Sequence, residues 1–199
     1  MPRLGMEPIR KAALVEATIT EIGRAGSLDV TVAQIARRAG VSSALAHHYF
    51  GSKEQMFLAA MRHILGLYGA EVRGALALAE GPRDRLRAVI RASFAASSFR
   101  RETIGAWLNF YVLAQTVPDV KRLLRVYQHR ICSNLRAPLR VLAPERAEAL
   151  AEGLAAMIDG VYLREVLGQR PPDGAQAAAM VLDYLDVQLA ARPNSGGAA

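Results

Sequence analysis

Apolar residues return every three or four positions along most of this chain. The stretches 101–116, 118–142 and 144–167 keep this spacing over several turns, and it places the apolar side chains on one face of an α-helix. No convincing run alternates apolar and polar residues in the way that a half-buried strand requires. The pattern therefore predicts an all-α fold.

Glycine and proline separate these amphipathic stretches. Proline is favoured in the first turn of a helix and glycine just past its end. Such residues divide the chain into about nine helices, expected at residues 8–25, 31–38, 42–48, 52–79, 82–97, 101–116, 118–142, 144–167 and 174–191. Residues 192–199 lack apolar periodicity, so we expect a disordered tail.

Two of the expected helix starts carry a capping box. In this motif a Ser or Thr hydroxyl and the side chain three residues later each accept a hydrogen bond from the other's backbone N–H group. The sequences Thr31-Val-Ala-Gln34 and Ser52-Lys-Glu-Gln55 have this form. Both stretches are therefore predicted to be helix N-termini.

Residues 31–50 fit two short helices joined by a tight turn. Gly40 stands at the turn, where a positive φ is expected, and Ser42 is a favoured cap for the second helix. Helices of about seven or eight residues do not persist alone in water, so packing must hold them. The side chains expected to face inward are Ile35, Ala36, Ala39, Val41, Ala46 and Tyr49. This is the spacing of a helix-turn-helix.

The second of these helices can lie in the major groove of DNA, where its exposed side chains meet base edges. Backbone N–H groups at helix N-termini and nearby basic side chains bind phosphate. The predicted DNA contacts are Arg10, Lys11, Thr31, Ser42, Ser43, Ala44, Leu45, His47, His48, Tyr49 and Lys53. The alternative is an ordinary pair of packed helices.

The charge of the chain suits a nucleic-acid partner without proving one. Its 199 residues carry a formal net charge of +7. Residues 1–53 hold 7 Lys and Arg against 4 Asp and Glu, so the positive excess is densest near the predicted helix-turn-helix.

Composition argues against a membrane or secreted protein. Apolar runs fall short of the roughly 18 residues that a membrane span needs, and the first residues do not resemble a secretory signal. The single cysteine, Cys132, excludes an internal disulfide framework and suits a reducing compartment. We expect a soluble, cytoplasmic protein with no membrane partner.

The adjacent His47 and His48 raise the question of a metal or catalytic site. Neighbouring residues on a helix point about 100° apart, and no HExxH motif or Cys cluster completes a metal shell. No Ser/His/Asp set, phosphate loop or informative carboxylate pair is present either. We therefore expect no metal, no cofactor and no enzymatic activity; a helical enzyme and a protein-binding adaptor are the alternatives from other classes.

Residues 31–57, TVAQIARRAGVSSALAHHYFGSKEQMF, resemble the DNA-binding signature of the TetR family of transcriptional regulators. The stretches MPRLGMEPIRKAALVEATI, AWLNFYVLAQ and LAAMIDGVYLREVL extend the resemblance to the BetI-type repressors over nearly the whole chain. The resemblance implies a dimeric repressor of choline uptake and glycine betaine biosynthesis genes, relieved or weakened by choline. It also implies a DNA-binding domain at 1–53 and a ligand-binding and dimerisation domain at 54–191.

The sequence departs from the family pattern at one position of the predicted recognition helix. Many members carry a Tyr that contacts phosphate at the position of His47, and an imidazole is shorter. The alternative function is a TetR-type repressor of other genes that responds to a different small apolar or cationic ligand.

A choline sensor needs aromatic faces and a carboxylate, because a quaternary ammonium has no N–H group to donate. Trp107, Phe110 and Tyr111 fall within an arc of about 100° on a helix. Asp159 and Tyr162 share a face of a later helix. We predict that the four rings form a cage around the cation and that Asp159 balances its charge.

Each part of this cage has a structural alternative. An aromatic stripe at helical spacing is equally typical of a hydrophobic core, and Asp159 lies in an apolar stretch where a buried carboxylate is costly unless paired. An ion pair with Arg164 or a place on an exposed helix edge would explain the carboxylate without a ligand.

The last two predicted helices carry more apolar surface than one hairpin can bury. Their apolar faces comprise Leu150, Leu154, Met157, Ile158 and Val161, then Met180, Val181, Tyr184, Leu185 and Leu189. The resemblance implies a homodimer in which this pair and its copy form a four-helix bundle. Two recognition helices would then read a pseudo-palindromic operator of double-stranded DNA.

Overall fold

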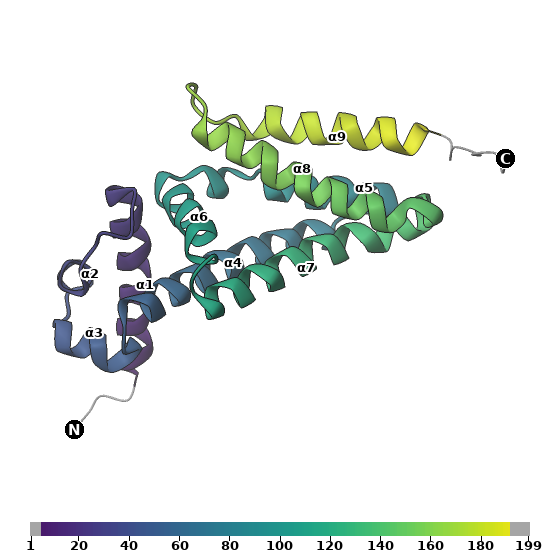
Figure 1. Ribbon diagram of the computed structural model, residues 1–199. Helices are drawn as coiled ribbons and strands as arrows, with labels where there is room; N and C mark the ends of the chain where they lie inside the picture. The colour runs from purple at the N-terminus through teal and green to yellow at the C-terminus, as the bar shows by residue number, and fades with distance from the viewer. Residues whose placement is uncertain (1–4, 192–199) are drawn as a thin grey trace. The chain divides into compact units, whose positions relative to one another are not determined.

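The computed structural model describes residues 5–191, and this part of the chain consists of helices and their connections (Figure 1). The predicted all-α fold is confirmed. The elements are α1 (Met6–Ala25), α2 (Val32–Arg38), α3 (Ser43–Phe50), α4 (Lys53–Ala77), α5 (Gly81–Ser93), η1 (Ala96–Phe99), α6 (Arg101–Leu113), α7 (Pro118–Leu142), η2 (Pro144–Arg146), α8 (Ala147–Leu167) and α9 (Gly174–Ala190). The predicted disordered tail, 192–199, lies outside the described residues.

One predicted helix ends earlier than expected and is followed by a separate short turn. The helix predicted at 82–97 ends at Ser93, and a separate 3-10 turn, η1, follows it. The Ser93 hydroxyl donates to the carbonyl oxygen of Val89 at 2.9 Å, and the N–H of Phe94 bonds to Arg91 in a tightened last turn. Phe94 is the C-terminal cap of α5, so the α-helix does not continue through 97 as predicted.

The described residues form two compact units. One comprises the residues up to Gly69 together with Ser97–Tyr127, and the other comprises Ala70–Ala96 together with the residues from Gln128 onward. Each unit is described separately below. The predicted division into a DNA-binding domain at 1–53 and a ligand-binding and dimerisation domain at 54–191 does not coincide with these units, and it stays a prediction.

The first unit is centred on α1, which packs against α2 and α6. Leu14 and Ile22 of α1 are almost fully buried, and Phe57 and Met61 of α4 are buried in the same unit. His63 of α4 lies 3.0 Å from the carboxylate of Glu16 on α1. The helix-turn-helix segment is therefore built onto a helical scaffold instead of standing alone.

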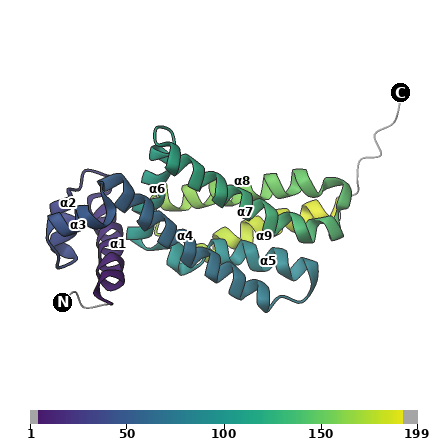
Figure 2. The ribbon, with the colours of Figure 1, turned by 90° about the horizontal axis from the view of Figure 1, so that it is seen from below.

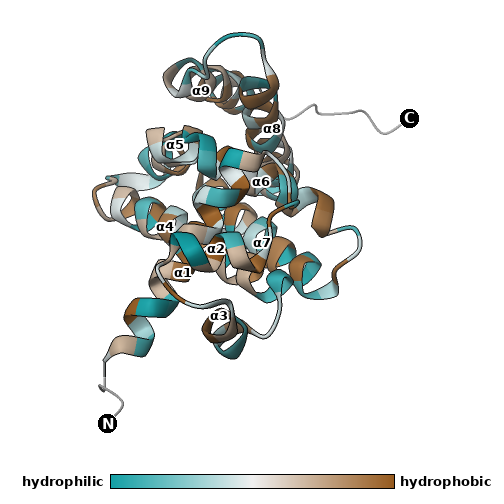
Figure 3. Ribbon diagram, turned by 90° about the vertical axis from the view of Figure 1, so that its left-hand side faces the viewer, coloured by the Kyte–Doolittle hydropathy of each residue, from teal (hydrophilic) through white to brown (hydrophobic). Residues whose placement is uncertain are grey.

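The second unit contains α8 and α9 side by side, with α5 packed against α9 (Figures 1 and 2). Hydrophobic and hydrophilic residues are mixed within these helices (Figure 3). Asp186 of α9 pairs with Arg87 of α5 at 3.0 Å and with Arg83 at 3.5 Å. Glu148 of α8 pairs with Arg136 and Arg140 of α7. Ion pairs thus reinforce the packing between helices in this unit.

No helix within residues 5–191 has both the length and the apolar character needed to cross a membrane.

Candidate functional site

The start of α2 has both halves of the predicted capping box. The Thr31 hydroxyl oxygen accepts from the N–H of Gln34 at 3.2 Å, and the Gln34 side-chain oxygen accepts from the N–H of Thr31 at 2.7 Å. Ser42 caps α3 by accepting from the N–H of Leu45 at 3.2 Å. Ser52 accepts from the N–H of Gln55 at 3.3 Å at the start of α4. All three predicted helix starts are therefore confirmed.

The turn between α2 and α3 depends on Gly40. Its φ is +68°, a backbone conformation that side chains with a Cβ rarely adopt. The N–H of Val41 bonds to the carbonyl oxygen of Ala36 at 3.0 Å, which closes the turn. Ala36 and Ala46 are almost fully buried, so the two helices approach closely at small residues.

The outward face of α3 carries the predicted base-reading positions. Ala44, His47 and His48 are exposed, and Ser43 and Leu45 are half-buried. Ala46 is the fully buried residue of this helix. The side of α3 that carries Ala46 packs against the rest of the unit, and the exposed side is available to contact another molecule.

His47 is tied to the end of its own helix. Its Nδ1 lies 3.1 Å from the carbonyl oxygen of Gly51. A carbonyl oxygen only accepts, so Nδ1 must be the donor, and in the neutral ring Nε2 is then an acceptor. Within residues 5–191 no three His, Cys, Asp or Glu side chains are grouped to hold a metal ion.

The predicted phosphate contacts from outside α3 have structural partners of their own. Lys11 lies over the Tyr49 ring, with its nitrogen 5.5 Å from the ring centroid, and pairs with Glu7 at 2.7 Å. Lys53 donates to the carbonyl oxygen of Leu28 at 3.0 Å. Lys53 therefore joins α4 to the connection between α1 and α2. Arg10, the third basic residue of this group, is half-buried on α1.

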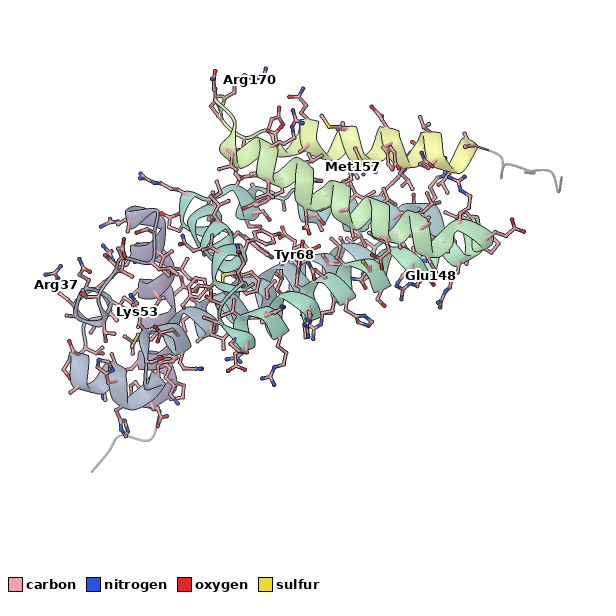
Figure 4. All side chains as sticks on the ribbon, in the orientation of Figure 1. Arg37, Lys53, Tyr68, Glu148, Met157 and Arg170 are labelled. Atoms are coloured by element: carbon pink, nitrogen blue, oxygen red, sulfur yellow. The ribbon has the colours of Figure 1, made fainter. Side chains whose placement is uncertain are left out.

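Arg37 was not among the predicted contacts, although it is exposed at the end of α2 and extends away from the helix (Figure 4). The next residue, Arg38, pairs with Glu21 of α1. The sequence feature that could have indicated a further DNA contact is the pair of adjacent arginines beside the turn. Their positions in the sequence do not reveal that Arg38 forms an ion pair with α1 while Arg37 extends outward.

The three predicted aromatic residues of α6 do come together. The Trp107 ring lies 5.6 Å from Phe110 and 5.8 Å from Tyr111, measured between ring centroids. Phe110 is fully buried, Trp107 is 8% exposed and Tyr111 is half-buried. The helical spacing therefore predicted this contact correctly.

Two further rings extend this group, and we call the five residues together the aromatic cluster. Tyr127 of α7 meets Trp107 edge to face with centroids 4.9 Å apart. Tyr68 of α4, labelled in Figure 4, lies 5.9 Å from Tyr127 in the same manner. Sequence reasoning missed both, although each lies on a helix face with buried residues one turn away, Ile64 for Tyr68 and Ile131 for Tyr127.

Asp159 and Tyr162 lie one turn apart on α8, which belongs to the other compact unit. Tyr162 is 7% exposed, and burial raises the pKa of its phenol above the ordinary value. Asp159 is half-buried. A site that combines them with the aromatic cluster stays a prediction.

Family models match both parts of the chain. Residues 14–60 match the model described as bacterial regulatory proteins of the tetR family, and residues 82–190 match the C-terminal model of BetI-type transcriptional repressors. The chain belongs to the TetR family. Its resemblance to BetI-type members is confirmed as well, and the family consists of transcriptional regulators, for which dimers and DNA binding are typical.

Curated relatives cover this TetR-family chain almost completely. The HTH-type transcriptional regulator BetI of Brucella suis is 52% identical over 196 residues, which are 98% of this chain and 99% of the relative. The BetI regulator of Agrobacterium fabrum is 49% identical over 98% of this chain and 95% of the relative.

Solved structures share the fold. A transcriptional regulator from Pseudomonas aeruginosa is 30% identical, with a TM-score of 0.82 over 94% of this chain and 93% of that one. A regulator from Saccharomonospora viridis, solved in complex with choline, is 22% identical, with a TM-score of 0.81 over 90% of this chain and 97% of that one. At 22% identity the second likeness concerns the fold alone.

Proposed function

We propose that this protein is a dimeric repressor that binds the operators of choline uptake and glycine betaine biosynthesis genes in the cytoplasm, and that choline relieves or weakens its binding. The observation that carries this proposal is the aromatic cluster around Trp107, because aromatic faces are the group that a quaternary ammonium requires. The names of the Brucella and Agrobacterium relatives support the choice of genes, and the choline-bound regulator from Saccharomonospora supports the choice of effector.

The outward face of α3 reads the operator in this proposal. Ser43, Ala44, Leu45 and His48 meet base edges in this proposal. Ala44 and His48 are exposed on the side of α3 away from Ala46, and Ser43 and Leu45 are half-buried in the N-terminal half of the helix. The N-termini of α2 and α3 at Thr31 and Ser42 direct backbone N–H groups at phosphates. The remaining phosphate contacts are Arg10, Lys11, Tyr49 and Lys53, and His47 stands where many family members place a Tyr that contacts phosphate.

The operator assignment has a direct test in a gel shift with promoter fragments of the protein's own choline genes. Leu45→Ala should weaken binding about 5- to 150-fold, since one lost base contact costs about 1–3 kcal/mol. Leu78→Ala is the matched control, because Leu78 is 86% exposed and lies in the other compact unit. Absence of any shift at low salt would contradict the proposal.

The aromatic cluster supplies the attraction for the effector. The faces of Trp107, Tyr111 and Tyr127 carry negative charge density, and a cation held against them gains about 0.5–2 kcal/mol per ring. Buried tyrosines cost more than leucine or isoleucine because each hydroxyl must find a hydrogen-bond partner. Tyr127 is buried and Tyr111 is half-buried, and in this proposal their ring faces attract the cation.

Asp159 provides the counter-charge in this proposal. The phenol of Tyr162 is neutral at physiological pH even at the ordinary tyrosine pKa of about 10, and burial raises its pKa further, so Tyr162 contributes a neutral ring. Asp159 is the carboxylate one turn away on the same helix, and it is half-buried. A cation bound beside it would compensate the cost of removing the carboxylate from water.

Trp107 is the single tryptophan of the chain, so its fluorescence reports on the cluster directly. We expect choline to change this fluorescence saturably, and 3,3-dimethylbutan-1-ol, the uncharged carbon analogue of choline, to bind at least tenfold more weakly. Equal affinities would favour the alternative, a TetR-type repressor for a different apolar ligand. A cationic ligand other than choline would appear as tighter binding in a series of quaternary ammonium compounds.

Dimerisation in this proposal uses α9 together with α8. Met180, Tyr184 and Val187 lie on one face of α9 and are 50%, 38% and 64% exposed. Large apolar residues exposed in a row are typical of a subunit interface. Sedimentation should give a dimer, and Val187→Asp should shift it toward a monomer; a wild-type monomer at micromolar concentration would contradict this part.

A further inference from the structure

The backbones of α1 and α6 touch at two glycines of the first unit. A Cβ atom on Gly105 would lie 3.0 Å from the Cα of Gly23 and 3.4 Å from the carbonyl oxygen of Ile22. A Cβ atom on Gly23 would overlap the Cα of Glu102. Both glycines are buried, so the two helices meet without a side chain between them.

On one side of this crossing, α1 is bonded to both helices of the helix-turn-helix. Glu21, two residues before Gly23, pairs with Arg38 of α2. Lys11, nearer the start of α1, lies over the Tyr49 ring of α3. A displacement of α1 therefore moves the surface that carries the recognition residues.

On the other side, α6 carries three rings of the aromatic cluster. Trp107 follows Gly105 by two residues, and the carbonyl oxygen of Gly105 accepts from the side-chain nitrogen of Asn109 at 2.8 Å. An ordinary helix contact absorbs small shifts by changing side-chain rotamers. A contact between backbones lacks that freedom, because close-packed main chains are not compressible.

We propose that the Gly23–Gly105 crossing is the contact through which the aromatic cluster and the DNA-reading helix affect each other. The proposal rests on the effector function proposed above and names its route. Both glycines are positioning residues, since neither touches the effector or DNA. Their role is to hold α6 against α1 so closely that a shift of α6 on effector binding displaces α1.

The test measures how strongly choline binding and operator binding affect each other. The first ratio compares operator affinity with and without saturating choline. The second ratio compares choline affinity, measured by Trp107 fluorescence, with and without the operator. Thermodynamic linkage requires the two ratios to be equal, and coupling of this kind typically lies at about 5- to 150-fold. A wild-type ratio of one would contradict the proposed function itself, which separates that failure from a failure of this inference.

Gly105→Ala is the informative variant, because its neighbour must give way by only a few tenths of an ångström. We expect both ratios to fall to less than a third of the wild-type value, while choline affinity without DNA stays within about twofold. The matched control is Gly66→Ala on α4 of the same unit, where an added Cβ meets nothing within 4 Å. Equal ratios in Gly105→Ala and wild type would overturn the proposal.

Hydrogen exchange on the unmodified protein tests the same contact without a variant that could fail to fold. Choline should change amide protection in residues 101–107 of α6 and also in residues 20–26 of α1. A change confined to α6 and α4, with α1 unaffected, would overturn the proposal. A change in both segments that is absent from Gly105→Ala would support it.

Discussion

The rings of Trp107 and Tyr127 meet edge to face with centroids 4.9 Å apart. The two residues belong to different helices of one unit, α6 and α7. Trp107 was predicted from the sequence as a ligand-binding residue, whereas Tyr127 was not. The aromatic cluster is therefore a tertiary feature built by three helices, of which α4 is the third.

Tyr127→Leu should weaken choline binding about 5- to 30-fold, because it removes one aromatic face from the proposed cage and leaves an apolar side chain of comparable size. Tyr127→Phe is the matched control and should stay within about threefold, since it retains the ring. Titration of Trp107 fluorescence measures both. If the Leu variant bound choline as tightly as the Phe variant, Tyr127 would be a packing residue.

Thr31→Ala should lower the free energy of unfolding by about 1 kcal/mol, because it removes the hydroxyl half of the capping box at the start of α2. Thr20→Ala serves as the comparison. Its hydroxyl bonds to the carbonyl oxygen of Glu16 inside α1, where no orphan N–H group is left behind. Thermal unfolding of both variants gives the difference, and equal losses would argue against a special role for the cap.

His47→Tyr should tighten operator binding severalfold. The His47 ring uses Nδ1 to bond Gly51, so the neutral ring presents an acceptor, and phosphate oxygens accept as well. A tyrosine hydroxyl supplies a donor at this position. His47→Phe separates the hydroxyl from the ring, and a Phe variant as tight as the Tyr variant in a binding isotherm would refute the explanation.

Arg146→Ala should destabilise the second unit by about 1–3 kcal/mol, because two carbonyl groups at the end of α9 lose their donor. Its guanidinium donates to the carbonyl oxygens of Gln188 and Ala191, both at 3.1 Å. Arg170→Ala is the control and should change stability by less than about 0.5 kcal/mol, because Arg170 is exposed between α8 and α9 (Figure 4). The dimer should also dissociate more readily in sedimentation with Arg146→Ala alone.

Alkaline pH should destabilise the protein through Tyr162. Burial raises the pKa of this phenol in the folded state, while the unfolded chain ionises near the ordinary value of about 10. The contribution of the neutral phenol to stability is therefore complete below about pH 10 and is lost as pH rises further. Tyr162→Phe should flatten the decline in denaturant midpoint above that pH; an unchanged decline would assign it to other groups.

Features set by neighbours in sequence were predictable. The Thr31–Gln34 capping box and the positive φ of Gly40 depend on a few adjacent residues, and the structure contains both. The proximity of Trp107, Phe110 and Tyr111 followed from the helical repeat alone. Each of these depends on local geometry, which a pattern of residue types encodes directly.

Features that depend on which helices meet were not predictable. Tyr68 and Tyr127 occupied ordinary apolar positions of their helices, and only tertiary packing brings them to Trp107. Gly23 and Gly105 were isolated glycines inside helical patterns, a sign of close approach that does not name the partner. The end of α5 at Ser93 likewise has no glycine or proline beside it in the sequence that would mark it.

The proposed recognition helix α3 has Ala46 as its one fully buried residue. Arg38 with Glu21, and Lys53 with Leu28, hold the surrounding module from outside the reading face. We therefore expect exchanges at Ser43, Ala44 or His48 to leave the fold intact. If these residues read the operator as proposed, new operator sequences can be acquired at these positions without passing through unfolded intermediates.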